Sequence, residues 1–217
     1  RSTSLGIYSL SRNFREAVPD AVTLPQHFMR NGYRTEAVGK LFHTGHGNHD
    51  DDASWSVPTH KEKVVEYLDP KNSAGGQLTR EEAFFTNQRL GEINKLPRGA
   101  AIETTDVADD AYADGRIADE AIRRLRAAKE RGTPLFLAVG FVKPHLPLTA
   151  PRKYFDLHDP AKFTLAPFQQ SPKGAPAHAG KIGGEIVNYD PLTVESLRAE
   201  RTQRELIHAY YACVSYM

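Results

Sequence analysis

Two short segments carry basic side chains that could bind and activate a tetrahedral anion. They are Gly39-Lys40-Leu41-Phe42-His43 and Lys143-Pro144-His145. A lysine supplies a compact positive charge, and a histidine can donate a hydrogen bond or a proton as charge develops on a leaving oxygen. The alternative is that both are solvated loops, the second held rigid by its proline. Convergence of the two segments on one anion is the functional hypothesis.

Three other features could carry chemistry, and each has a simpler structural interpretation. Asp50, Asp51 and Asp52 could bind a divalent cation, but three consecutive acids point in different directions and are usually a hydrated loop, so no metal ligand is assigned. Trp55 could stack on a sugar, although a core position is favoured. Cys213 lies on an apolar helix face, which indicates a buried thiol rather than a nucleophile.

The first basic segment is positioned by a short helix followed by a strand. Thr23 is a predicted helix N-cap, and Asn31-Gly32 is the predicted stop. Residues 33 to 39 form a strand candidate that ends at a glycine, and residues 44 to 60 are rich in Gly, His, Asn and Asp, which predicts a loop.

The second basic segment also follows a helix and a strand. Apolar residues at helical spacing predict an amphipathic helix from Asp106 to about Arg131, with Gly132 as its C-cap. The continuous apolar run at 134–141 is typical of a strand buried on both faces of a parallel sheet. Helix then strand, twice, predicts an α/β fold, in which ligand sites lie beyond the strand ends.

The last third of the chain divides into a loop region and a helix. Residues 156 to 192 contain many Pro, Gly and Lys residues, which predicts a long surface excursion. Residues 194 to 217 return to helical spacing, and their predicted apolar positions are Leu197, Leu206, Ile207 and Tyr210.

Composition excludes several classes of protein. The 217 residues are 40% hydrophobic with a net charge of +1, so charge gives no reason to expect nucleic acid or a membrane surface as partner. One cysteine excludes an internal disulfide framework and a multi-cysteine zinc site. No apolar run is long enough to predict a membrane span, and no pattern indicates an oligomeric state.

Several motifs, in this order and at this approximate spacing, resemble the type I sulfatase family, specifically its iduronate-2-sulfatase-like branch. The matching segments are Leu24-Pro25-Gln26-His27-Phe28 through Asn31-Gly32-Tyr33, Val38 to His43, Asp51 to Ser56, Phe136 to Pro147 and Tyr210 to Tyr216. They extend over nearly the whole chain, which is more specific than any single motif.

The resemblance implies an alkaline-phosphatase-like fold, a mostly parallel sheet flanked by helices, and hydrolysis of a sulfate ester. The substrate would be an O-sulfated saccharide, such as a 2-O-sulfated uronate in a glycosaminoglycan or an algal polysaccharide. Family members use a formylglycine nucleophile, made from Cys or Ser in a Cys/Ser-x-Pro-Ser-Arg motif, together with calcium. They are periplasmic, secreted or lysosomal.

The resemblance also assigns roles to individual residues. Lys40 and His43 match the sulfate-binding Lys and its neighbouring His, and His145 matches the His that contacts sulfate and assists the leaving group. Lys143 is given only a supporting or substrate-side role. Independently of the resemblance, Trp55 remains the candidate sugar platform. Two residues separate Lys40 from His43, whereas the commonest sulfatases have one, and this favours the iduronate-2-sulfatase-like branch.

The nucleophile motif is absent from these residues. The resemblance therefore predicts that residues 1–217 are the central part of a single catalytic domain. The nucleophile segment and the calcium ligands would lie outside them, and the isolated chain would be inactive. Two alternatives stay open: a phosphodiesterase or phosphonate hydrolase of the same superfamily, and a non-catalytic protein that binds sulfated glycans.

Overall fold

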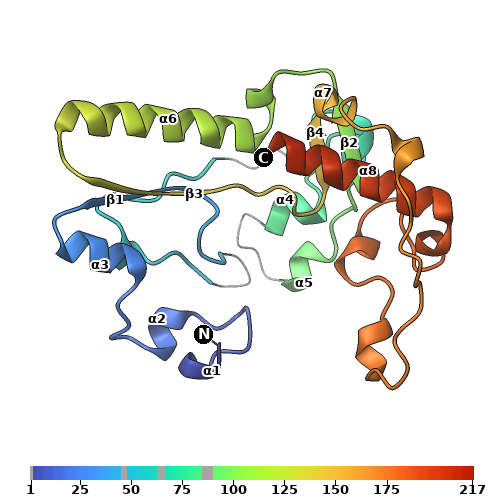
Figure 1. Ribbon diagram of the computed structural model, residues 1–217, viewed down its shortest axis with the longest axis horizontal. Helices are drawn as coiled ribbons and strands as arrows, with labels where there is room; N and C mark the ends of the chain where they lie inside the picture. The colour runs from blue at the N-terminus through green and yellow to red at the C-terminus, as the bar shows by residue number, and fades with distance from the viewer. Residues whose placement is uncertain (1, 45–47, 63–66, 85–89) are drawn as a thin grey trace. The chain divides into compact units, whose positions relative to one another are not determined.

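The computed structural model describes residues 2–44, 48–62, 67–84 and 90–217. The chain forms two compact units (Figure 1). Unit 1 comprises Arg1–Val65, Arg80–Leu96 and Asp109–Val142. Unit 2 comprises Glu66–Thr79, Pro97–Ala108 and Lys143–Met217.

Both units combine helices with parallel strands, so the α/β prediction is confirmed. Unit 1 contains α1 (Ser2–Leu5), α2 (Phe14–Ala17), α3 (Leu24–Arg30), β1 (Arg34–Gly39), α4 (Arg80–Phe84), α5 (Leu90–Ile93), α6 (Ala113–Arg131) and β3 (Leu135–Gly140). Unit 2 contains β2 (Ile102–Thr105), β4 (Leu148–Pro151), α7 (Arg152–Phe155) and α8 (Glu200–Tyr216).

Helix α3 begins and ends where its capping residues predict. The Thr23 side chain accepts a hydrogen bond from the Gln26 backbone N–H, and the Gln26 side chain accepts one from the Thr23 N–H at 2.9 Å. This reciprocal capping box satisfies two N–H groups that the first turn leaves without helical partners. The helix ends at Arg30, before Asn31, and therefore delivers the chain directly into β1.

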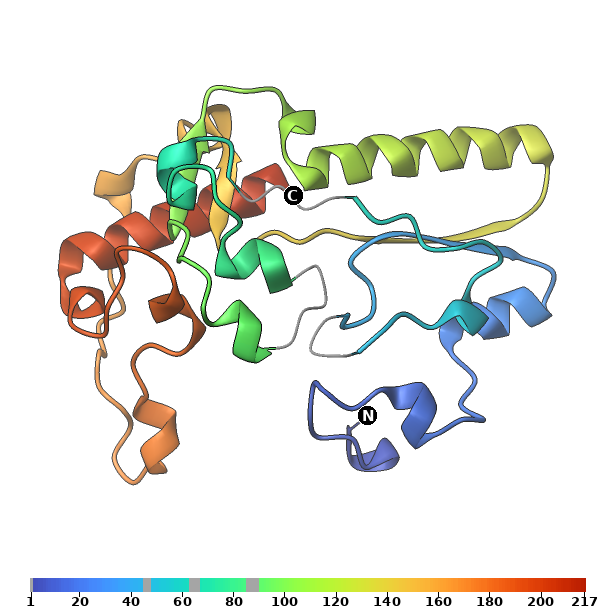
Figure 2. The same ribbon diagram turned by 180° about the vertical axis from the view of Figure 1, so that it is seen from behind.

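Strands β1 and β3 form a parallel pair in register from Arg34 with Leu135 to Gly39 with Gly140. Helix α6 covers one face of the pair and α3 the other, as Figure 2 also shows from behind. The prediction that the second strand is buried on both faces is wrong, because β3 is only half-buried along its length. A two-stranded sheet, all that the described residues form here, is too narrow to enclose it.

Helix α6 begins at Ala113 rather than at the predicted Asp106. A 3₁₀ helix at Asp109–Ala111 precedes it and packs against its first turn. A Cβ at Gly115 would lie 2.0 Å from the Asp109 carbonyl oxygen, so the glycine permits this contact. The predicted stop is confirmed, since α6 ends at Arg131 with Gly132 in the left-handed conformation.

A buried carboxylate ties α6 to β1. Glu36 is 4% exposed, and its two oxygens accept hydrogen bonds from Arg124 at 2.9 Å and from Arg131 at 3.1 Å. Arg34, on the same strand, approaches the carboxylate at 2.5 Å. Arg124 also bonds Glu120 at 2.8 Å, which continues the network along the helix. Removing one member would leave a buried charge uncompensated, so this network fixes the helix on the strand.

Unit 2 is built on a second parallel pair, in which β2 pairs with β4. Neither strand was predicted. Helix α8 packs on β4 through the small residues Ala209, Ala212 and Cys213, all fully buried. Tyr210, predicted as one of the apolar positions at helical spacing, is 49% exposed, because the small residues let the helix approach the strand closely. Of the other predicted positions, Leu197 and Leu206 pack against the core.

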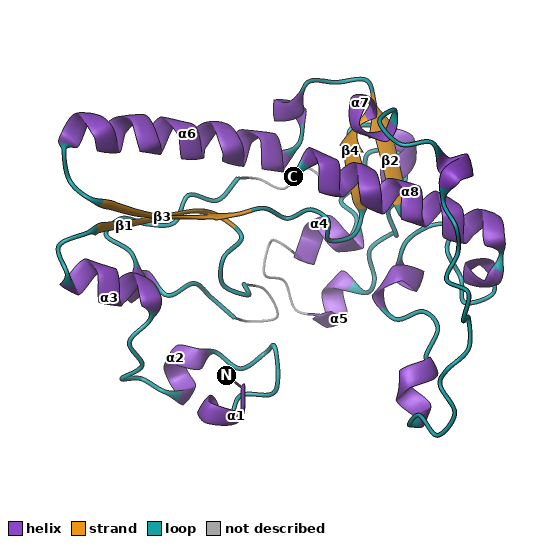
Figure 3. Cartoon of the chain, in the orientation of Figure 1, coloured by secondary structure: helices purple, strands orange, loops and turns teal. Residues whose placement is uncertain are grey.

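The excursion at 156–192 is confirmed as a largely exposed segment that contains only short 3₁₀ helices (Figure 3). Tyr189 is its main anchor, being fully buried in a core cluster with Ala101 and Leu192. Within the described parts of the chain, no helix combines the length and apolar character required to cross a membrane.

Candidate active site

Lys40 is placed by a close crossing of two backbones at the ends of β1 and β3. A Cβ at Gly140 would lie 1.8 Å from the Lys40 carbonyl oxygen, and a Cβ at Gly39 would lie 2.2 Å from the Gly140 carbonyl oxygen. Gly39 also has a φ of 81°, which favours glycine. The Lys40 N–H donates to the Gly140 carbonyl at 2.8 Å, so the turn that presents Lys40 is fixed to β3.

A second segment, which contains His60, pairs with the other edge of β1 near Lys40. The Gly39 N–H donates to the His60 carbonyl at 2.8 Å, and the His60 N–H donates to the Ala37 carbonyl at 3.0 Å. This parallel bridge sets Lys61 and Glu62 beside the end of the strand.

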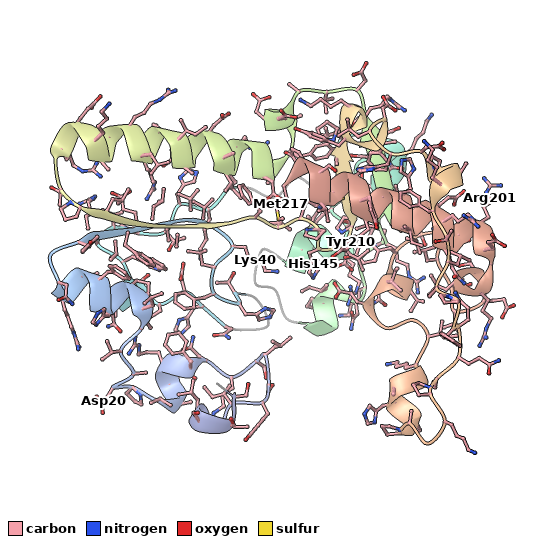
Figure 4. All side chains as sticks on the ribbon, in the orientation of Figure 1. Asp20, Lys40, His145, Arg201, Tyr210 and Met217 are labelled. Atoms are coloured by element: carbon pink, nitrogen blue, oxygen red, sulfur yellow. The ribbon has the colours of Figure 1, made fainter. Side chains whose placement is uncertain are left out.

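A cavity of about 80 Å³ lies at this strand end in unit 1. Since a cavity of roughly 10–15 Å³ by the same measure can hold one water molecule, it has room for a small polar group. Its charged lining residues are Lys40 (labelled in Figure 4), Lys61, Asp50 and Glu62. The described lining residues include Ile117 and Val142 but not His43.

Aromatic packing holds the turn that follows Lys40. The Phe42 ring stacks on Phe14 with 5.4 Å between centroids and lies 6.0 Å from the Trp55 ring. Trp55 is 8% exposed, which leaves little of its ring for a sugar to stack on and supports the core interpretation. His43 is half-buried, and its Nε2 atom is enclosed.

The acidic run after His43 is used structurally. Asp51 is 5% exposed, and its carboxylate accepts hydrogen bonds from Arg15 at 2.9 and 2.8 Å and from the Ser54 hydroxyl at 2.5 Å. The Arg15 hydrogen bond, the largest influence, lowers the pKa of Asp51, although burial opposes this. Asp50 pairs with Lys61, and Asp52 begins a short 3₁₀ helix. The three acids therefore point to different partners.

In unit 2, Lys143 and His145 lie in a turn with cis peptide bonds before Pro144 and Pro147. Lys143 is 6% exposed, and its Nζ donates to the Pro147 carbonyl at 2.5 Å. This contact stabilises the turn. His145 is more accessible, with its Nδ1 bonded to the Leu146 carbonyl at 2.6 Å and its Nε2 3.6 Å from a Glu185 oxygen.

The predicted site residues thus fall into two groups. Lys40, His43 and Trp55 belong to unit 1, and Lys143 and His145 belong to unit 2. Convergence of the two groups on one anion stays a prediction.

Comparison with known proteins shows what the whole chain is similar to. No protein-family model matches it. Iduronate 2-sulfatase of Homo sapiens is 30% identical over 234 residues, covering all of this chain and 38% of that protein. The Mus musculus iduronate 2-sulfatase is 30% identical over 228 residues with the same coverage, and a sulfatase of Formosa agariphila is 28% identical over 226 residues, or 41% of its length.

The chain is similar to sulfatases over its whole length. It is iduronate-2-sulfatase-like, as the motifs predicted, and its parallel strands flanked by helices are consistent with part of an alkaline-phosphatase-like sulfatase domain. The chain spans about two fifths of the length of these curated sulfatases.

Three residues that line the Lys40 cavity were not predicted as site residues. Asp50 was considered only as a metal ligand, and Lys61 and Glu62 were not considered at all. No local pattern signals the last two, because they reach the cavity through the bridge between His60 and β1.

Proposed function

We propose that the full-length protein to which this chain belongs hydrolyses a sulfate ester of a sugar. The relatives matched over the whole chain are named iduronate 2-sulfatase or sulfatase. The geometric observation that carries the proposal is Lys40, held by the Gly39 and Gly140 crossing at the edge of a small cavity.

Lys40 neutralises charge on the bound sulfate group in this proposal. Its backbone is fixed on both sides, so the point from which its side chain extends at the cavity is set before the substrate arrives, and preorganised positive charge of this kind stabilises a transition state. The cavity volume of about 80 Å³ suits one small anionic group better than a whole sugar ring. The sugar would therefore extend away from the cavity.

His145 assists the departing oxygen in this proposal. A carbonyl can only accept, so the 2.6 Å contact with Leu146 requires a proton on Nδ1 and leaves Nε2 as the working nitrogen. A Glu185 oxygen lies 3.6 Å from Nε2. His43 orients the anion, and Lys143 supports the turn that carries His145.

Calcium and a formylglycine nucleophile belong to the proposal for the full-length protein. The described residues do not themselves fit a calcium site, since they contain no group of three or more His, Cys, Asp or Glu side chains able to hold a metal. Asp51, the most buried of the acidic run, is already bonded to Arg15 and Ser54. Cys213 is fully buried, with its Sγ 3.7 Å from the Thr149 carbonyl, and is inaccessible as a nucleophile.

The test is turnover of 4-nitrophenyl sulfate and of a 2-O-sulfated uronate disaccharide by the full-length protein. We expect Lys40→Ala and His145→Ala each to lower kcat by about 10²- to 10³-fold. Lys129→Ala and His178→Ala remove the same side chains at exposed positions and should leave kcat unchanged.

Unchanged turnover in Lys40→Ala or His145→Ala would contradict the roles assigned here. Faster turnover of matched phosphate diesters than of sulfate esters would favour a phosphodiesterase. Binding of sulfated oligosaccharides without any turnover would favour a glycan-binding protein. An export route to the periplasm, the lysosome or the cell exterior is part of the same proposal and is tested by fractionation.

A further inference from the structure

The wall of the Lys40 cavity contains an ion pair that the proposed reaction does not use. An Asp50 oxygen lies 3.5 Å from Lys61 Nζ, and both residues line the cavity with Lys40. The Asp50 side chain is only 13% exposed, whereas that of Lys61 is 51% exposed. The more buried member of the pair is therefore the carboxylate.

A second carboxylate in the same wall is stabilised in its charged form by two basic partners. Glu62 lies 2.9 Å from His60 Nε2 and accepts a hydrogen bond from Arg116 at 3.0 Å. The His60 hydrogen bond, followed by that of Arg116, outweighs burial and lowers the pKa of Glu62. The described lining thus offers two lysines and two carboxylates to whatever enters.

Such a lining discriminates between anions by charge rather than by shape. A sulfate monoester carries one negative charge, whereas a phosphate monoester of the same tetrahedral shape carries nearly two in neutral solution, because its second pKa is about 6. Each additional ligand charge is attracted by Lys40 and Lys61 but repelled by Asp50 and Glu62. A lining without the carboxylates would prefer the dianion.

We propose that Asp50, paired with Lys61, makes the Lys40 cavity selective for anions with a single negative charge and excludes phosphate monoesters. This inference rests on the proposed sulfatase function and names the residue that sets its choice of ester. Asp50 is the better candidate than Glu62, whose carboxylate is engaged by two partners that a substitution would also release.

Asn is the appropriate replacement at Asp50. Asp50 Oδ1 accepts a hydrogen bond from the Asp51 N–H at 2.9 Å, and an amide oxygen preserves that bond while removing the charge. Asp52→Asn is the matched control: it makes the same change two residues further on, at an exposed residue outside the described lining.

The experiment measures binding of two non-hydrolysable probes to the full-length protein by calorimetry. Benzenesulfonate carries one negative charge, and phenylphosphonate carries two in mildly alkaline solution and one in mildly acidic solution. In alkaline solution, Asp50→Asn should strengthen phenylphosphonate binding relative to benzenesulfonate by about three- to tenfold, the size expected for one charge acting across a partly solvated cavity.

Lys61→Gln should change the same ratio in the opposite direction, and Asp52→Asn should leave it unchanged. In mildly acidic solution the effect of Asp50→Asn on the ratio should disappear, because the two probes then carry equal charge. A general loss of folded protein would reduce the binding of both probes alike and would not change the ratio of their affinities.

An alkaline ratio that is the same in Asp50→Asn and in the unmodified protein would overturn the inference, as would failure of the unmodified protein to bind either probe. The proposed function fails separately. A protein that binds benzenesulfonate and shows the predicted ratio change, but releases no sulfate from any ester, would refute the sulfatase proposal and leave the charge selectivity standing.

Discussion

Replacing Gly140 with alanine tests whether the backbone crossing at the strand ends positions Lys40. An alanine Cβ there would lie 1.8 Å from the Lys40 carbonyl oxygen and 2.4 Å from its carbonyl carbon. Real Cβ atoms essentially never approach other atoms closer than 3.0 Å, so the Lys40 peptide would have to retreat by about 1.2 Å.

The expected cost has two parts. Overpacking in a tight site costs about 1–3 kcal/mol, and stretching the 2.8 Å bond from the Lys40 N–H to the Gly140 carbonyl costs about 1 kcal/mol more. We therefore expect the free energy of unfolding to fall by about 2–4 kcal/mol in urea denaturation. Because a misplacement of about 1 Å can reduce catalysis by roughly 10²-fold, kcat/KM on 4-nitrophenyl sulfate should fall by a similar factor.

The direction of the stability change is diagnostic. In an ordinary strand, exchanging Gly for Ala stabilises by about 0.5–1 kcal/mol, the opposite of the expected result. Gly91→Ala in the same unit is the matched control, because nothing lies within 4 Å of its added Cβ. If Gly140→Ala were as stable and as active as the unmodified protein, the crossing would not position Lys40.

Three further outcomes follow from described contacts. Glu36→Gln should lower the free energy of unfolding by about 1.5–3 kcal/mol because Arg124 loses one of its two carboxylate partners and keeps only Glu120, whereas Glu130→Gln at an exposed position should change it little. Hydrogen bonds from Arg123 and then Arg124 lower the pKa of Glu120 to about 2, below its unfolded value of about 4.3. Its contribution is therefore complete above about pH 5 and is lost as the pH falls toward 2, so the stability difference between the unmodified protein and Glu120→Gln should shrink over that range. Cys213 should react with a thiol reagent only at the rate of unfolding, and fast labelling of the native protein would contradict its burial.

Local signals predicted the elements that hold Lys40. Thr23 and Gln26 bond each other within one turn, and Gly39 ends β1 where glycine is required by a positive φ. Both are short-range effects, so the sequence contains them directly. The same is true of Gly132 at the end of α6.

The strands of unit 2 escaped prediction because their signals are tertiary. Strand β2 is Ile-Glu-Thr-Thr, and its polar Glu103 is 2% exposed only because it accepts the backbone N–H groups of Leu68 and Asp69. Strand β4 ends in a proline, which usually argues against a strand. Neither segment looks like a buried strand until the distant partners are known.

The exposed positions of α8 were misjudged for a related reason. Helical spacing predicts that the helix has apolar faces, but it does not predict which of two neighbouring faces is buried. Small residues at Ala209 and Ala212 decide this by allowing close approach to β4, which leaves Tyr210 outside. The charged lining of the Lys40 cavity was missed similarly, since Lys61 reaches it only through the bridge to β1.

The bond between Glu36 and Arg124 joins residues 88 positions apart in the chain and has a consequence for how this sequence can change over time. A neutral residue at either position alone removes one partner from a partly buried network of charges that also contains Glu120 and Arg131, so single replacements are selected against. Replacing both by apolar residues would in turn remove partners of Glu120 and Arg131. Among relatives that share this strand and helix, these four positions should therefore vary together.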